Sequence, residues 1–348
     1  MRAPTDGPAL VVDCHAHYIP DSVIDVLRAG QRFPRIAISA AGEELRFTFP
    51  GQAMSQPAPA RISSLPDFSG WLDRNGINIQ ILSPWTDLLG YTLEEREACR
   101  WVSFLNDSMI SAVSGDDRFA TLAGIPLPHA EVAVAEIRRA QSAGHVGVVI
   151  GTAAPGAELD DPRFDPVWAE LAITRMPVLL HPTFLARDPR LQLHGLANAV
   201  GRAHETTLAL SRLLLSGVLG RHPGLRMIAA HGGGSLPFLL RRLQRAHEMN
   251  PGSSSPAEAF GRLYVDSVVL DPRVLAALLT ITDTGRVLLG SDYPFPWEPD
   301  PVGLIGLVPA AREAAGAILG GNACELFGLG NASAWAARRG QHEREDVR

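Results

Sequence analysis

The segment Val12–His17, with the sequence Val-Asp-Cys-His-Ala-His, ends the first of several short apolar runs along the chain. Side chains two residues apart in a strand point to the same face, so His15 and His17 project together while Cys14 points away. Two imidazoles on one face at the C-terminal end of a strand provide half of a metal site. Taken alone, a His-x-His motif does not distinguish such a site from two histidines that bind nothing.

Apolar runs rich in Val, Ile and Leu recur along the chain, with helical patterns between them. These runs are Ala9–Cys14, Ile77–Ser83, Ala120–Ile125, Val146–Ile150, Val178–His181, Met227–His231, Leu263–Ser267 and Val287–Ser291. Continuous apolar runs that alternate with amphipathic stretches are typical of parallel strands buried on both faces. We therefore predict an α/β fold, a closed (β/α)8 TIM barrel, although the spacing alone is also compatible with an open sheet.

One longer segment, residues 31–66, separates the first run from the second and is rich in Gly, Pro, Ser and Ala. Its alternating stretch Glu44–Phe49 indicates a small hairpin. We expect this segment to be an insertion over the mouth of the barrel, where substrate contacts often lie. The predicted barrel domain spans residues 1–330, and a C-terminal tail follows at 331–348.

The composition argues against several classes of protein. A chain of 348 residues suffices for one large domain, since a barrel of this kind takes about 250. The net charge of −6 and the lack of a basic run argue against nucleic acid as a partner. No apolar stretch is long enough to span a membrane, so we expect a soluble, cytoplasmic protein. Its cysteines are too few for a disulfide framework.

Three further polar residues each follow a later apolar run. They are His181 after the fifth run, His231 after the sixth and Asp292 after the eighth. Because the C-terminal ends of barrel strands converge on one mouth, we expect these side chains to meet His15 and His17 there. Two to three imidazoles and one carboxylate suit Zn2+ first, while Mn2+, Fe2+ and Co2+ accept the same ligands. A catalytic ion keeps a position open for water or substrate, and lowers the pKa of that water toward about 7.

Four motifs together resemble the amidohydrolase superfamily, namely His15-x-His17, His181-Pro182, His231–Ser235 and Gly290–Pro296. They are most similar to the amidohydrolase-2 branch, which includes 2-amino-3-carboxymuconate-6-semialdehyde decarboxylase. The resemblance implies that His231 acts as a base toward a metal-bound water. It also implies the ligands of one divalent metal ion, which fall on His15, His17, His181 and Asp292.

The resemblance also bears on the substrate. Arg242 falls where related decarboxylases use an arginine that reaches the substrate carboxylate of a neighbouring subunit, which implies a homodimer. The branch carries a second substrate arginine in the insertion, and Arg46 and Arg61 are the candidates here. An aromatic residue after the His-Pro motif is replaced by Thr183, and a pocket tryptophan falls near His194, which we take as a further candidate contact. These departures imply a substrate other than the muconate semialdehyde.

The chain has no lysine. Members of the superfamily with two metals commonly bridge them with a carboxylated lysine, so we expect one ion. A Schiff-base mechanism also needs a lysine amine. We predict a metal-dependent decarboxylase, a carbon–carbon lyase, that acts through a metal-bound water on a small unsaturated or aromatic carboxylic acid. The same ligands could serve a hydrolase or hydratase of a small lactone, amide or unsaturated acid. A binding protein with a vestigial site is a third hypothesis, disfavoured because every ligand is present.

Other residues near the ends of the runs have two interpretations. Asp266 follows the seventh run, where it could orient a ligand or play a hydrogen-bonded structural part. Four aromatic residues could form pocket walls or pack in the core. They are Trp85, Phe184, Tyr293 and Trp297.

Overall fold

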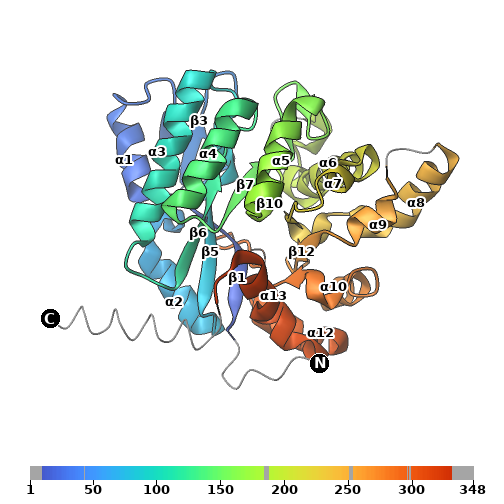
Figure 1. The fold of residues 1–348 in the computed structure, drawn as a ribbon. Coiled ribbons are helices and arrows are strands. Elements are labelled where there is room, and N and C mark those ends of the chain that lie inside the picture. Colours follow the sequence, from blue (N-terminus) through green and yellow to red (C-terminus); the bar gives the residue numbers. More distant parts are fainter. Residues whose placement is uncertain are drawn as a thin grey trace.

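The computed structural model describes residues 10–42, 44–183, 188–250, 254–295, 297 and 299–330. Its centre is an eight-stranded parallel sheet in the order β1-β5-β6-β7-β10-β11-β12-β13 (Figure 1). The strands are β1 (Val12–Tyr18), β5 (Ile79–Pro84), β6 (Phe119–Gly124), β7 (Gly147–Gly151), β10 (Val178–His181), β11 (Met227–Ala229), β12 (Tyr264–Asp266) and β13 (Val287–Leu288).

Main-chain hydrogen bonds join the first strand to the segment that follows the last one. The Cys14 amide donates to the Leu289 carbonyl at 2.9 Å, and the Asp292 amide donates to the His15 carbonyl at 2.8 Å. A parallel bridge also pairs Ala16 with Tyr293. These contacts bring the two edges of the sheet together, so the predicted (β/α)8 barrel is confirmed and the open sheet is not.

Each predicted run overlaps a strand of the barrel, but the last strand is shorter than predicted. The run Val287–Ser291 contains only the two residues of β13. The following residues leave the β12 ladder and turn toward β1, where Ser291 and Asp292 both donate to the His15 carbonyl. Asp292 has a positive φ of 59°, which no strand residue adopts. A short strand followed by this turn places the Asp292 side chain at the mouth.

Helices connect the strands and lie outside them (Figure 1). Helix α2, for example, begins where the Ser64 hydroxyl accepts from the Asp67 amide, and ends at Gly76 in the left-handed region. The helices are α1 (Asp21–Ala29), α2 (Leu65–Asn75), α3 (Glu95–Val113), α4 (Ala130–Ala143), α5 (Asp165–Thr174), α6 (Arg202–Ser216), α7 (Val218–Arg221), α8 (Leu236–Met249), α9 (Pro256–Phe260), α10 (Pro272–Leu278), α11 (Pro301–Leu307), α12 (Pro309–Glu313) and α13 (Asn322–Phe327).

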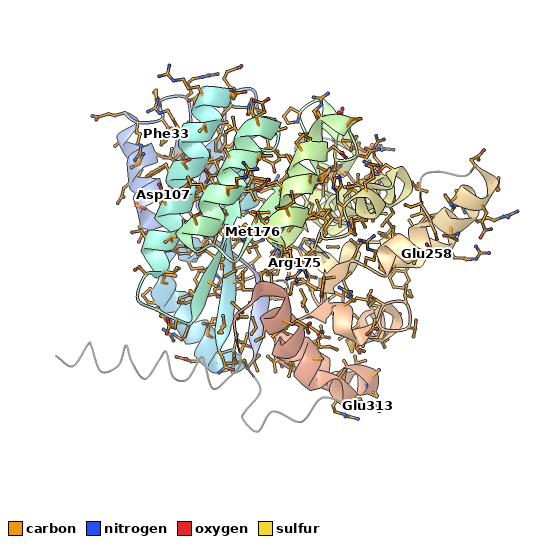
Figure 2. The ribbon with its side chains drawn as sticks, in the orientation of Figure 1. Phe33, Asp107, Arg175, Met176, Glu258 and Glu313 are labelled. Carbon is orange, nitrogen blue, oxygen red and sulfur yellow. The ribbon has the colours of Figure 1, made fainter. Side chains whose placement is uncertain are left out.

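The strands are buried on both faces, as parallel strands under a layer of helices must be. Val148, Val149 and Ile150 of β7 are all fully buried. At the surface, charged pairs join neighbouring helices. Asp107 of α3, labelled in Figure 2, accepts a hydrogen bond of 2.6 Å from Arg139 of α4. Among the helices that the structure describes, none is long and apolar enough to cross a membrane.

A small antiparallel sheet lies between α1 and α2. It contains β2 (Ala37–Ala41), β3 (Glu44–Thr48) and β4 (Ala58–Pro59). The stretch Glu44–Phe49, predicted as a hairpin, forms the single strand β3, which pairs with β2 in a hairpin and with β4 on its other edge. Its buried residue Phe47 packs edge to face against Trp85, with ring centroids 5.9 Å apart. Because Trp85 follows β5 directly, this contact fixes the small sheet at the C-terminal end of the barrel strands. The tail at 331–348 lies outside the described residues.

Candidate metal centre and active site

His15 and His17 project from one face of β1, and their Nε2 atoms lie 3.2 Å apart. His181 ends β10, which lies across the barrel, and its ring centroid is 4.6 Å from that of His17. Asp292 completes the group from the turn after β13. One ligand atom from each of these four residues lies within 4.8 Å of all the others. Strand ends distant in the sequence therefore converge on one point.

Each ligand imidazole is held through its Nδ1 atom. His15 Nδ1 lies 2.7 Å from the Asp266 carboxylate. His17 Nδ1 lies 3.0 Å from the Ser83 hydroxyl, which itself donates to the Ala16 carbonyl. His181 Nδ1 lies 3.0 Å from the Pro182 carbonyl, which can only accept. In all three rings the proton therefore sits on Nδ1, and the lone pair of Nε2 faces the centre of the group.

The geometry fits a divalent cation at this point. The Nε2 atom of His181 is buried and has no hydrogen-bond partner among the described residues. The Asp292 Oδ1 atom lies 3.0 Å from His17 Nε2 and 3.5 Å from His15 Nε2. Ligand nitrogens bound to a tetrahedral zinc ion stand roughly 3.3 Å apart, close to these separations. Bare lone pairs that face one another repel unless a cation lies between them.

The charges of these groups suit the same ion. Burial lowers the pKa of His17 to about 4 and that of His181 well below its usual value, so both imidazoles are neutral. Burial alone would raise the pKa of Asp292, but hydrogen bonds to His17 and His231 hold it well below its usual value. Burial also opposes protonation of His15, whose pKa is nevertheless raised by Asp266. Neutral imidazoles and an ionised carboxylate are the forms that bind a metal ion, so His17, His181 and Asp292 are already in these forms, and a bound cation would keep His15 neutral as well.

His231 lies beside these four residues. It belongs to η6 (His231–Gly233), and its Nε2 atom is 3.5 Å from Asp292 Oδ2. The two oxygens of Asp292 therefore face different partners, with Oδ1 toward the ligand histidines and Oδ2 toward His231. The His231 side chain is 17% exposed, whereas His15 and His17 are fully buried, and His231 is not among the described residues that line the cavity.

Asp266 supports both His15 and His231. Its Oδ2 atom faces His15 Nδ1 and accepts from the His231 amide at 2.9 Å. Its Oδ1 atom accepts from the amides of Gly232 and Val268. Gly232 has a positive φ of 62° in this turn. The two interpretations of Asp266 thus combine, because one buried carboxylate orients a ligand through a structural hydrogen-bond network.

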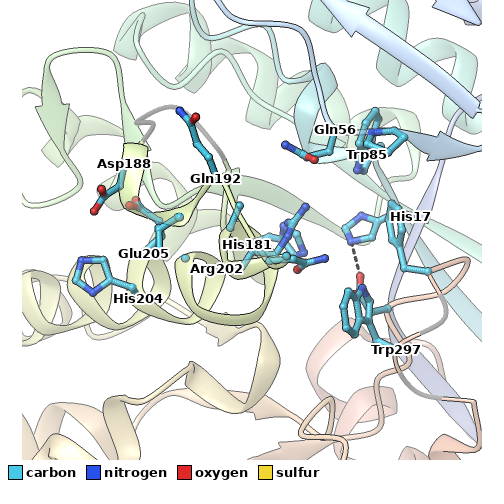
Figure 3. Close-up of a pocket in the computed structure, with 18 of the residues that line it drawn as sticks. His17, Gln56, Trp85, His181, Asp188, Gln192, Arg202, His204, Glu205 and Trp297 are labelled. Atoms are coloured by element: carbon cyan, nitrogen blue, oxygen red, sulfur yellow. Dashed lines mark ion pairs between the residues drawn. The ribbon is translucent and has the colours of Figure 1, made fainter.

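A cavity of about 890 Å3 opens onto the metal centre. Figure 3 shows Asp188, His204 and Glu205 at one side of it, Arg202 and His181 in the middle, and His17 and Trp85 at the other side. A dashed line in the figure marks the ion pair between His17 and Asp292. The described residues that line the cavity are His17, Gln56, Pro57, Trp85, His181, Asp188, Pro189, Leu191, Gln192, Gly195, Ala197, Asn198, Gly201, Arg202, His204, Glu205, Asp292, Phe295 and Trp297.

Aromatic residues form part of the wall. Trp85 and Trp297, two of the four candidates, line the cavity together with Phe295. Tyr293 does not belong to this group, because its ring stacks on Trp71 with centroids 4.5 Å apart. Phe184 lies outside the described residues. Flat apolar walls suit a planar substrate.

Among the described residues that line the cavity, none of the predicted substrate contacts appears. Arg61 donates to the Pro294 carbonyl at 2.9 Å and so supports the turn that carries Asp292. Arg46 lies on β3, 3.6 Å from the Glu44 carboxylate. His194 is exposed in the loop beside the cavity, and Arg242 is exposed on α8. The substrate-binding roles of these four residues stay predictions.

Sequence reasoning missed several residues of the site. Arg202, His204 and Glu205 come from the start of α6, and Gln56 comes from the insertion. Ser83 and Thr86 hold His17 and His181 from the end of β5. A serine, a threonine or an arginine in a helical pattern is common, so no motif distinguishes these residues. Gln56 is the exception, because it belongs to the insertion that the sequence predicts over the mouth of the barrel.

Comparison with known proteins identifies the family to which this chain belongs. The family model described as "Amidohydrolase" matches residues 94–329, and the chain belongs to the amidohydrolase family. The chain is 34% identical over 268 residues to 2-amino-3-carboxymuconate-6-semialdehyde decarboxylase of Dictyostelium discoideum, an alignment that covers 74% of this chain and 75% of that protein. The predicted resemblance is therefore confirmed.

Two further relatives are decarboxylases by name. Gamma-resorcylate decarboxylase of Rhodococcus jostii strain RHA1 is 28% identical over 249 residues, which cover 64% of this chain and 75% of that protein. The crystal structure of 5-carboxyvanillate decarboxylase from Novosphingobium aromaticivorans, complexed with manganese and 4-hydroxy-3-methoxy-5-nitrobenzoic acid, superposes with a TM-score of 0.76. It is 21% identical in sequence, with 92% of this chain and 96% of that chain covered.

Proposed function

We propose that this chain is a metal-dependent decarboxylase, a carboxy-lyase that acts on a small aromatic or unsaturated carboxylic acid. One observation carries the proposal, namely the convergence of three Nε2 atoms and one carboxylate oxygen at the floor of an aromatic-walled cavity. The relatives support the release of carbon dioxide over hydrolysis or hydration, because they are decarboxylases by name.

His15, His17, His181 and Asp292 would hold the ion. When bound, a divalent cation supplies positive charge that polarises substrate oxygens and bound water. The reaction breaks the bond between the carboxyl carbon and the ring or alkene carbon, and a proton must take the place of the lost carboxyl group. His231 is the group placed to move that proton, since its Nε2 atom lies 3.5 Å from Asp292 Oδ2, beside the proposed metal ligands, and its side chain is 17% exposed.

A direct test supplies metal-loaded protein with a panel of hydroxybenzoic and unsaturated dicarboxylic acids and measures carbon dioxide release. The His231→Gln variant should keep its metal content and lose about 100- to 10,000-fold in rate, the usual contribution of a positioned acid or base. Absence of carbon dioxide from every acid would contradict the proposal. A product heavier than its substrate by one water would identify the hydrolase or hydratase instead.

The identity of the ion is a further part of the proposal. Imidazole and carboxylate ligands favour zinc, and they also accept manganese. The crystals of 5-carboxyvanillate decarboxylase contain manganese. Elemental analysis of the purified protein should find one divalent ion per chain. His181→Ala should reduce this content to near zero, whereas Arg212→Gln, an exposed change on α6, should leave it unchanged. Two ions per chain would contradict the single-metal site.

We also propose that the chain forms a homodimer in the cytoplasm and that Arg242 reaches the substrate of its partner. Helix α8 extends away from the strands in Figure 1. Phe238, 55% exposed, lies one turn before Arg242 on the same face of this helix. An exposed apolar residue beside an arginine suits a contact between subunits.

Mixed dimers test this arrangement. His231→Gln and Arg242→Gln proteins should each be nearly inactive alone. A heterodimer of the two would contain one site with both residues intact, so co-expression should restore about a quarter of the wild-type rate when the chains pair at random. A monomer in light scattering, or no recovery in the co-expressed protein, would contradict the shared site.

A further inference from the structure

Arg202 lines the cavity but has no role in the proposed mechanism. It is the first residue of α6, and it lines the cavity together with the ligands His17, His181 and Asp292. Figure 3 shows it between His204 and Glu205 on one side and His17 on the other. A guanidinium so near a metal centre is a candidate partner for an anionic ligand.

The Pro182 carbonyl ties Arg202 to the metal centre. This oxygen accepts from the Arg202 guanidinium at 3.3 Å and from His181 Nδ1 at 3.0 Å. A ligand histidine and the arginine therefore share one acceptor, which fixes the guanidinium relative to the ion. A guanidinium has five N–H donors in a planar fork, so it can hold this carbonyl and a ligand oxygen at the same time.

The surroundings of Arg202 also favour an anion. Burial lowers the pKa of the guanidinium, while the negative charges of Asp87 and Asp292 act in the opposite direction. Burial is the main cause of the lowered pKa of both His17 and His181, and the positive charge of Arg202 adds to it. A bound cation would pair with the negative charge of Asp292. Arg202 would then lie in a partly desolvated cavity with one of its counter-charges engaged elsewhere, so a ligand carboxylate would gain a charge-assisted contact.

The rest of the cavity orients such a ligand. Trp85, Phe295 and Trp297 provide flat apolar walls. Asp188 and Glu205 line the side away from the metal centre. Arg190 pairs with Asp188, so Glu205 is the carboxylate that a second substrate carboxylate would meet there. The cavity therefore has a cationic floor and an acidic opposite side.

We propose that Arg202 binds the carboxylate of the substrate from within the same subunit and selects planar monocarboxylic acids that enter with the carboxylate toward the metal. This inference rests on the proposed function, because it takes the ligand to be a carboxylic acid. It adds a specificity-determining residue to the site and predicts that hydroxyl or amino substituents face Asp188 and Glu205.

Binding of two matched probes tests the proposal without turnover. Salicylate and salicylamide have the same ring and hydroxyl group, and only salicylate has a carboxylate. Isothermal titration calorimetry on manganese-loaded protein should show tighter binding of salicylate. Arg202→Gln should weaken salicylate by about 10- to 100-fold, the range of a hydrogen bond to a charged group, and change salicylamide by less than about threefold.

Two further variants separate charge from structure. Arg202→Lys keeps the charge but not the planar fork, so it should recover part of the salicylate affinity. Arg212→Gln, on the same helix but paired with Asp160 at the surface, should bind both probes as the wild type does. Equal effects of Arg202→Gln on both probes, or no preference for salicylate in the wild type, would overturn the proposal.

The outcome separates this inference from the proposed reaction. A salicylate preference that depends on Arg202, in a protein that releases carbon dioxide from no acid, would support the carboxylate contact and contradict the decarboxylase. Carbon dioxide release that Arg202→Gln leaves unchanged in both KM and kcat would support the decarboxylase and contradict the contact.

Discussion

Ser83 shows how one hydroxyl sets the chemistry of a metal ligand. It accepts from His17 Nδ1 at 3.0 Å and donates to the Ala16 carbonyl at 3.1 Å, so its own proton is already committed. His17 must therefore keep its proton on Nδ1 and turn the lone pair of Nε2 toward the ion. Asp266 and the Pro182 carbonyl impose the same tautomer on His15 and His181.

We expect Ser83→Ala to weaken metal binding by about 10- to 100-fold, as loss of a group that orients a ligand commonly does. The change removes the acceptor of a buried imidazole N–H, and His17 is then free to rotate. Competition with a chromogenic chelator measures the affinity. Ser142→Ala, which removes an exposed hydroxyl of α4 that donates to the Arg138 carbonyl, is the matched control. An unchanged affinity in Ser83→Ala would mean that other contacts fix the ring.

The sequence predicts the metal residues better than the residues around them. His15, His17, His181 and Asp292 follow apolar runs, and strand ends converge whatever the details of packing. Ser83 and Arg202 carry no such mark, because their roles depend on which side chains the closed barrel brings into hydrogen-bond range. The predicted arginines show the same limit, since Arg61 donates to the Pro294 carbonyl rather than lining the cavity.

The turn after β13 is the element on which the site depends most closely. It passes between β12 and β1, and Gly290 lies where a side chain would meet both neighbours. A Cβ at this position would stand 3.1 Å from Asp266 Cβ and 3.2 Å from His15 Cβ. The apolar run Val287–Ser291 correctly predicts a strand here. It does not predict that the strand stops after two residues so that this close approach can occur.

Gly290→Ala should therefore displace His15 and Asp266 by a few tenths of an ångström. We expect the free energy of unfolding to fall by about 1–3 kcal/mol, as for other overpacked sites, and the metal affinity to fall at least tenfold. Gly306→Ala is the matched control, because an added Cβ in α11 meets no heavy atom within 4 Å. Calorimetry and chelator competition measure both quantities, and equal behaviour of the two variants would contradict the close contact.

At the scale of the whole molecule, the metal centre joins the first strand of the barrel to the last. A ligand that binds only the folded chain raises its stability by about 2.7 kcal/mol at a concentration of 100 Kd. We expect removal of the ion with a chelator to lower Tm by several degrees, and re-addition of zinc or manganese to restore it. In His181→Ala the same treatment should have no effect on Tm. A shift of equal size in that variant would place the stabilising ion elsewhere.

His145 gives the fold a pH dependence that is independent of the metal centre. It lies buried at the N-terminal side of β7, with Nδ1 2.9 Å from the Thr121 hydroxyl. Burial, helped by the charge of Arg139, lowers its pKa from 6.5 to about 4. The unfolded chain takes up this proton more readily than the folded one. The contribution of neutral His145 to the free energy of unfolding is therefore fully present above pH 6.5 and is lost as the pH falls toward 4.

His145 contributes up to about 3 kcal/mol to the free energy of unfolding between pH 6.5 and pH 4. Each tenfold difference in proton affinity between the folded and unfolded chains is worth about 1.4 kcal/mol. His145→Asn does not titrate, so its free energy of unfolding should fall less between pH 7 and pH 4 than that of the wild type. Urea unfolding at both pH values measures the difference. Parallel pH profiles for the two proteins would contradict the lowered pKa.

The alternation of apolar and amphipathic segments is enough to predict parallel strands beneath a layer of helices, whereas the hydrogen bonds between β1 and the residues after β13 show that the sheet closes into a barrel. What periodicity cannot supply is the lining of the cavity. Gln56 of the insertion and Arg202 of α6 meet there only because the barrel is closed.

Closure through the Cys14–Leu289 and His15–Asp292 hydrogen bonds has a consequence for biosynthesis. His15 emerges from the ribosome well before Asp292, so a nascent chain that does not yet contain Asp292 cannot offer the full set of donors. Metal loading must then follow completion of the last strand. Metal binding therefore indicates that the barrel has closed.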